Sequence, residues 1–263
     1  MEIPLRSSLH SQRRKSLALW LRCTLCLAHV RLLHQRRSDR RIPRNSRNLE
    51  LSRRAIGRLI PLSFNYLRSF CSLLERTEVP PRFAIWCGIS SLLAMVERRV
   101  WIPQGIYNIY PNFFIILIAA SGQKKSTPIN LVDKLIRRVT EDGPNIVAQK
   151  VSPEALIGAI KVTENKNPKK LGAQSCGGIV IADELATFLD RGALDRGLGP
   201  VLTKLFDCSP FEYETLKRGS EKIEGGYLSI LGGTTVELLR SCLPRDAIGG
   251  GFTSRTIFVY EEK

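Results

Sequence analysis

The chain has 263 residues, enough for one large α/β domain or for a domain of about 200 residues with an appendage. The net charge of +16 is unevenly placed: residues 1–60 hold 14 arginines and one lysine against three acids, so +12 lies there and the remaining residues carry +4. Seven irregularly spaced cysteines do not indicate a disulfide framework. The apolar segments are too short to span a membrane, so we expect a cytoplasmic protein with no membrane partner.

Residues 1–58 form an Arg-rich leader with almost no acids. We expect a disordered or artefactual segment, and the alternative is an arm that binds nucleic acid. Cys23, Cys26, His29 and His34 could each bind zinc. Only two residues separate Cys26 from His29, where a zinc finger needs about a dozen, so the spacing disfavours a metal site.

Two helices are predicted at 61–77 and 83–102, and we assign residues 59–110 to a helical region that braces the core. The run FFIILIAA at 113–120 is apolar throughout, as in a central strand of a parallel sheet. Residues 111–263 then alternate between predicted strands and helices. The helices are expected at 128–142, 152–163, 186–192, 199–209 and 236–244; the strands at 177–184, 227–235 and 255–261, with a hairpin before the second of these.

This alternation predicts a parallel, doubly wound α/β sheet. Ligands bind such sheets beyond the carboxyl ends of the strands, so the residues after each strand are the candidates for a site.

A possible phosphate-binding loop follows the first strand. In the pattern G-x-x-x-x-G-K-[ST], backbone N–H groups cradle the phosphates, the lysine binds the β- and γ-phosphates, and the hydroxyl binds Mg²⁺. Aligned on Lys125 and Ser126, the two glycine positions are occupied by Ala119 and Lys124. An alanine can serve where the backbone φ angle is ordinary. Taken alone, the string also fits a simple polar turn. The candidate nucleotide-binding residues are Ser121, Gly122, Gln123, Lys124, Lys125, Ser126 and Thr127.

Polar residues also follow the later strands. Asp183 and Glu184 come after the apolar run IVIA, where one acid can hold Mg²⁺ and the next can polarise water; an acidic pair there can also simply cap a helix. Thr234 and Thr235 follow the next strand. Arg255 precedes the last strand, and it is a candidate to stabilise charge on a transferred phosphoryl group.

Several phrases occur in an order similar to that of a known family. They are YPNFFIILIAASGQKKST, VSPEALIGAI, GGIVIADELATFL, LTKLFDCSPFEYETLKRGSEKI, LSILGGTTVELL and GGGFTSRTIFVYEE. With them the segment from about Phe83 to Glu261 resembles the P-loop ATPase domain of phage and mobile-element replication proteins, the helicase-like half of primase-helicases. The resemblance implies a RecA- or AAA-like sheet with flanking helices, and ATP hydrolysis linked to DNA replication.

The resemblance also implies roles for individual residues. Lys125 would bind ATP, while Ser126 and Asp183 would hold Mg²⁺. Glu184 would orient water, and Thr235, with Thr234 beside it, would sense the γ-phosphate. Arg255 would act in cis, or in trans within a ring-shaped homo-oligomer. The implied partner is DNA, single-stranded in the first instance.

The chain stops directly after the last strand, whereas such domains continue into a helical segment, so we expect a truncated form. Two other functions stay open. One is a degenerate module that binds nucleotide or DNA without turnover. The other is a small-molecule kinase, which would need an acceptor pocket that the sequence does not indicate.

Overall fold

The computed structural model describes residues 65–139, 144–166, 177–189, 197–215, 219–243 and 250–262. The expectations for the leader, including the four cysteines and histidines there, fall outside these residues. The chain divides into two units, Met1–Ser72 and Leu73–Lys263. In the first unit the described element is α3, Tyr66–Ser72, a shorter helix than the predicted 61–77.

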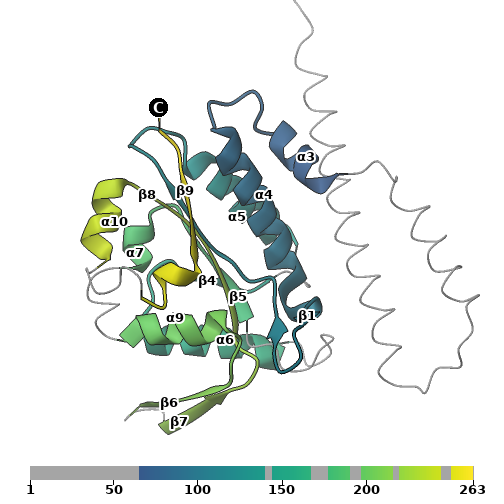
Figure 1. Ribbon diagram of the computed structural model, residues 1–263, viewed down its shortest axis with the longest axis vertical. Coiled ribbons are helices and arrows are strands. Elements are labelled where there is room, and N and C mark those ends of the chain that lie inside the picture. Colours follow the sequence, from purple (N-terminus) through teal and green to yellow (C-terminus); the bar gives the residue numbers. More distant parts are fainter. Residues whose placement is uncertain are drawn as a thin grey trace, which may run out of the picture. The chain divides into compact units, whose positions relative to one another are not determined.

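The second unit contains a five-stranded sheet flanked by helices (Figure 1). All neighbouring strands are parallel, and their order is β4-β5-β8-β3-β9. Its strands are β3 (Phe114–Ile118), β4 (Ile146–Val147), β5 (Gly177–Ala182), β8 (Tyr227–Thr234) and β9 (Thr256–Tyr260). The predicted α/β class and parallel sheet are therefore confirmed. The two-residue strand β4 was not predicted, because a segment that short carries no periodicity.

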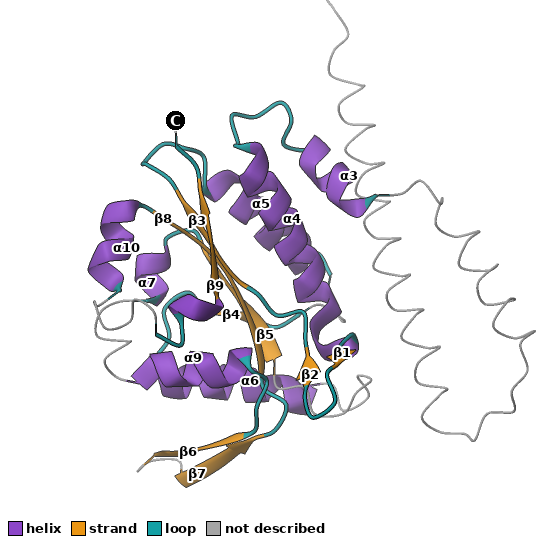
Figure 2. Cartoon of the chain, in the orientation of Figure 1, coloured by secondary structure: helices purple, strands orange, loops and turns teal. Residues whose placement is uncertain are grey.

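Every residue of β3, β5 and β8 is buried, as the continuous apolar runs predicted. The helices around the sheet are α4 (Pro81–Val96), α5 (Ser126–Arg137), α6 (Pro153–Lys166), α7 (Leu185–Phe188), α9 (Gly199–Phe206) and α10 (Val236–Cys242). Figure 2 shows α4 and α5 on one side of the sheet and α6, α7, α9 and α10 on the other. Alternate β3 residues serve the two faces, and Phe114, Ile116 and Ile118 pack in the cluster formed with α6, α7 and α9.

Several local signals in the sequence are confirmed. The Oγ of Ser152 accepts a hydrogen bond from the backbone N–H of Ala155 at 3.3 Å and so caps α6. The strands β6 (Phe211–Thr215) and β7 (Gly219–Ile223) form the predicted hairpin as a separate two-stranded sheet.

The expectation of helix throughout residues 59–110 is wrong for the residues after Arg99. The helix α4 ends at Val96, and after a short 3₁₀ turn, η1 (Glu97–Arg99), the chain forms an antiparallel hairpin of β1 (Ile102–Pro103) and β2 (Asn108–Ile109). The turn contains Gly105 at a φ of 74°, a conformation that glycine adopts without strain. The helix α4 packs on β3, β8 and β9, and it lies in the same unit as the sheet.

None of the described helices combines the length and apolar character needed to cross a membrane.

Candidate functional site

Two residues of the loop between β3 and α5 have a positive φ angle. Gly122 has a φ of 83°, and Lys124 has a φ of 55°. Ala119, at the first glycine position of the pattern, is buried and has an ordinary φ. The glycine missing at Ala119 therefore costs no backbone strain, whereas the one missing at Lys124 does, because left-handed backbone disfavours residues with a Cβ.

The side chain of Lys125 lies across this loop. Its Nζ donates hydrogen bonds to the carbonyl oxygens of Ala119 and Ala120, each at 2.8 Å. Burial lowers the pKa of Lys125, while the negative charges of Glu184 and Glu237 oppose that shift. The ammonium is thus partly desolvated, and the negative charges of two acids from other parts of the chain act on it.

The neighbouring Lys124 is exposed. Its Nζ lies 3.3 Å from Oε2 of Glu78, a carboxylate whose side chain is 82% exposed. An ion pair this accessible to water contributes little to stability, so Lys124 remains available to another anion.

No described side chain caps the amino end of α5, whose first turn contains no acid. Ser126 is its first residue and is exposed. Uncapped N–H groups with their partial positive charge favour an anion at such a helix end.

Asp183 and Glu184 follow the end of β5 and make different contacts. Glu184 caps α7: its Oε1 accepts from the backbone N–H of Ala186 at 3.4 Å and from Oγ1 of Thr234 at 3.2 Å. Asp183 is exposed, and its Oδ1 accepts from the N–H of Glu184 at 3.1 Å. The helix-cap interpretation of this pair is therefore correct for Glu184, and the same carboxylate also faces the charge of Lys125.

The two threonines after β8 also differ in position. Thr234 is buried at the strand end, in register with Ile118 of β3, and contacts Glu184. Thr235 accepts a hydrogen bond from the N–H of Leu238 at 3.3 Å and caps α10. The sequence predicts Thr235 as the sensor with Thr234 beside it. In the fold Thr234 is the residue that contacts Glu184, and the sensing role of Thr235 stays a prediction.

Three adjacent strands therefore bring Lys125, Glu184 and Thr234 to the carboxyl edge of the sheet. The strand β8 lies between β3 and β5, which explains why Thr234 stands between the lysine loop and the acids. Gly233 permits the close approach: a Cβ there would lie 3.0 Å from the carbonyl oxygen of Asp183 and 3.6 Å from the Cβ of Lys125. No pattern in the sequence indicates this packing role.

Arg255 does not join this cluster. It precedes β9, whose first residue pairs with Phe114 at the start of β3, so Arg255 lies at the opposite, amino edge of the sheet. Five residues of strand, about 16 Å at ~3.3 Å per residue, separate the two edges. The expected action of Arg255 in cis is therefore wrong for this arrangement.

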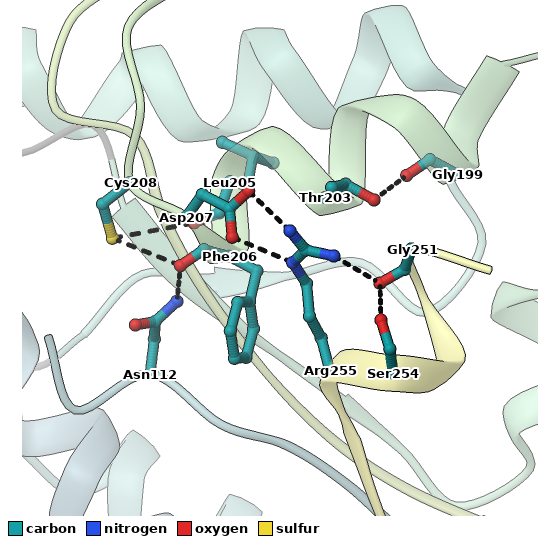
Figure 3. A network of polar contacts seen from close by, with 10 residues as sticks. All are labelled: Asn112, Gly199, Thr203, Leu205, Phe206, Asp207, Cys208, Gly251, Ser254 and Arg255. Atoms are coloured by element: carbon teal, nitrogen blue, oxygen red, sulfur yellow. Dashed lines mark hydrogen bonds and ion pairs between the residues drawn. The ribbon is translucent and has the colours of Figure 1, made fainter. Parts of the chain in front are cut away.

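Instead, Arg255 joins two segments that are distant in sequence (Figure 3). Its Nε and Nη2 donate to the two carboxylate oxygens of Asp207 at 2.9 and 2.8 Å, and its Nη1 donates to the carbonyl of Gly251 at 2.9 Å. The guanidinium also lies over the ring of Phe206, and Asn112 binds the carbonyl of the same residue at 2.6 Å. These contacts of the guanidinium link the end of α9 to the turn before β9.

Two functional candidates were missed from the sequence. Glu237, on the first turn of α10, acts on the charge of Lys125, and Asp207 holds Arg255. Neither residue stands in a recognisable motif, because each acquires its partner only through the tertiary fold.

Among the described residues no group of three or more His, Cys, Asp or Glu could hold a metal ion. A magnesium site of another kind fits the residues present. Ser126 and Asp183 both expose oxygen atoms at this edge, and Mg²⁺ is commonly bound through one or two protein oxygens, substrate phosphates and waters.

Comparison with models of known protein families finds no match, and comparison with curated protein sequences finds no significant similarity.

Proposed function

We propose that this chain is a helicase-like P-loop ATPase that binds and hydrolyses ATP with Mg²⁺ in the replication of phage or mobile-element DNA. The observation that carries the proposal is the assembly of Lys125, Glu184 and Thr234 at the carboxyl edge of a parallel sheet. That edge is where open α/β sheets bind their ligands.

The loop residues 121–127 would hold the phosphates. The uncapped amino end of α5 offers N–H groups, and Lys125 offers an ammonium that burial has already stripped of part of its water. An incoming phosphate would replace the carbonyls of Ala119 and Ala120 as the partner of Nζ. Because Gly122 accepts a positive φ, the loop can curve around an anion.

Other residues of the site would bind the metal ion and the attacking water. Ser126 and Asp183 would hold Mg²⁺, which supplies charge neutralisation to a transferred phosphoryl group. Glu184 would accept a hydrogen bond from water, and the hydroxyl of Thr234 fixes the orientation of that carboxylate.

Hydrolysis of ATP by the purified chain tests the proposal, with and without single-stranded DNA. We expect Lys125→Ala and Glu184→Gln to lower the rate by about a hundredfold or more, as removal of one charge-stabilising group typically does. Lys134→Ala is the matched control, since it removes an exposed lysine of the same helix α5. Turnover that survives in both site variants would refute the proposal.

A second candidate is a module that binds nucleotide or DNA without turnover. It is favoured by the contacts within the site, because Nζ of Lys125 binds backbone carbonyls and Glu184 caps α7. This candidate predicts no ATP hydrolysis but nucleotide binding that Lys125→Ala abolishes, measured by equilibrium dialysis. A nucleotide affinity that is the same in the variant would exclude it.

A further inference from the structure

The β1–β2 hairpin exposes apolar and aromatic side chains that a stable surface usually avoids. All residues from 100 to 109 are exposed. Ile106 at the turn is 98% exposed, Tyr107 59% and Trp101 44%, and Val100, Ile102 and Ile109 are also exposed. The hairpin has only two residue pairs, Ile102 with Ile109 and Pro103 with Asn108. A ribbon this small is marginal in water, and its exposed apolar residues indicate a surface used for binding.

The charge of the segment favours a negatively charged partner. No Asp or Glu occurs between Glu97 and Asp133. Arg98 at the base of the hairpin donates from Nη2 to the hydroxyl of Tyr110 at 2.9 Å, and its Cζ lies 4.4 Å from the centre of that ring. Within the described part of the chain no carboxylate pairs with Arg98, and its buried Nε has no hydrogen-bond partner. The arginine is therefore held in place, and no carboxylate of the described residues neutralises its charge.

We propose that the β1–β2 hairpin binds single-stranded nucleic acid, with bases stacking on Trp101 and Tyr107 and the backbone attracted by Arg98. Exposed aromatic rings beside uncompensated positive charge are the combination that sequence-tolerant single-strand binding requires. Ile106 supplies further apolar contact at the turn. A purely apolar protein partner would gain nothing from the absence of acids.

This surface is separate from the nucleotide site. Only Tyr110, Pro111, Asn112 and Phe113 lie between β2 and β3, so the hairpin joins the amino end of β3, whereas Lys125 follows its carboxyl end. Figure 1 shows the hairpin at the end of the sheet away from the carboxyl terminus. The proposal names the partner surface of the suggested ATPase but does not depend on nucleotide hydrolysis.

Fluorescence anisotropy with a labelled oligo(dT) tests the proposal on the full chain without nucleotide. Replacing both Trp101 and Tyr107 by Ala is expected to raise Kd by about tenfold or more, because each stacked base contributes substantially to affinity. The loss should persist at about 300 mM salt, where phosphate contacts made elsewhere in the chain contribute least. Replacing both residues by Phe keeps a ring at each position and should leave Kd within about threefold of wild type.

Two further variants separate stacking from charge and from general damage. Arg98→Gln should reduce the slope of log K against log salt by about one, whereas the aromatic substitutions should not change that slope. Tyr260→Ala removes an aromatic side chain of similar exposure, 49%, at the other edge of the sheet and should bind like wild type. Circular dichroism checks that each variant is folded.

The inference is overturned if the double Ala variant is folded and binds within about twofold of wild type. It is also overturned if the Phe variant is as weak as the Ala variant, which would show that stacking is not involved. A change in sedimentation of the double Ala variant with unchanged oligo(dT) affinity would assign the hairpin to self-association instead. The outcome is independent of the proposed function, since Lys125→Ala should lower the rate of ATP hydrolysis by about a hundredfold or more while leaving oligo(dT) affinity unchanged.

Discussion

The loop between β3 and α5 allows a test of backbone strain at the position where a glycine is missing. Lys124 has a φ of 55°, so Lys124→Gly is expected to stabilise the protein despite removing a side chain. Relief of left-handed strain contributes about 1–2 kcal/mol, and the greater freedom of glycine in the unfolded chain offsets about 0.4–1 kcal/mol of it. The ion pair with Glu78 is exposed, 49% and 82%, and its loss costs at most a few tenths of a kcal/mol. The net gain should be about 0.5–1 kcal/mol.

Lys124→Ala is the matched control, because it removes the same charge and keeps the strain. At an ordinary φ the alanine variant would be the more stable one, since glycine loses more entropy on folding. Here the glycine variant should exceed the alanine variant by about 1 kcal/mol. Urea denaturation measures the difference, and the melting temperatures should differ by about 2–4 °C for a chain of this size.

Gly122→Ala, in the same loop, should change stability in the opposite direction to Lys124→Gly. Its φ is 83°, and an added Cβ would meet no atom within 4 Å, so any loss of stability comes from the backbone alone. We expect a loss of about 1 kcal/mol. If Lys124→Ala is at least as stable as Lys124→Gly, or if Gly122→Ala is neutral, the assigned loop conformation is incorrect.

Three further predictions concern the rest of the unit. Arg255→Met should lower the free energy of unfolding by about 1–2 kcal/mol, because it leaves Asp207 unpaired. A double-mutant cycle with Asp207→Asn should give a coupling energy of about 0.5–1 kcal/mol, and additive effects of the two substitutions would contradict the contact. Burial raises the pKa of Cys208 to about 12 and that of Cys87 strongly, so both thiols stay protonated in the folded chain while the unfolded thiols ionise near pH 9.0. These two thiols should not affect the free energy of unfolding below pH 9.0. Above it, that free energy should fall by up to about 1.4 kcal/mol per pH unit for each thiol. Cys87→Ala should make the fall with pH smaller, as measured by urea titrations at about pH 8, 9 and 10. Gly233→Ala would place a Cβ 3.0 Å from a backbone oxygen at the end of β5, so it should lower the free energy of unfolding by about 1–3 kcal/mol and weaken nucleotide binding. Thermal melting with and without ATP measures both effects. An unchanged melting temperature would show that the strands move apart freely.

Much of the fold could be predicted because its elements carry strong local patterns. The apolar runs at 113–120 and 177–182 became β3 and β5, and Ser152 caps α6 as predicted. The hairpin at 102–109 was missed, because its apolar residues continue the composition of the preceding helix. The boundary between helix and hairpin is visible only in the structure, where α4 ends at Val96 and the next residue has a φ of 50°.

The candidate site was predictable only where its residues directly follow strands. Parallel strands place their carboxyl ends at one edge, so chain order alone led to Lys125, Glu184 and Thr234. Arg255 precedes its strand, and the same rule places it at the far edge, a consequence that the resemblance to a family obscured. The choice between Thr234 and Thr235 depended on which hydroxyl points to Glu184, and adjacent residues in one sequence do not reveal that.

The α/β class, the buried strands and the polar residues that follow them can be predicted from the amino-acid sequence alone, because the hydrophobic pattern is a local property. Which charges meet depends on the tertiary structure. The fold lets the charge of Glu237 act on Lys125, binds Arg255 to Asp207 and joins Thr234 to Glu184. These interactions depend on how strands from distant parts of the chain are ordered in the sheet.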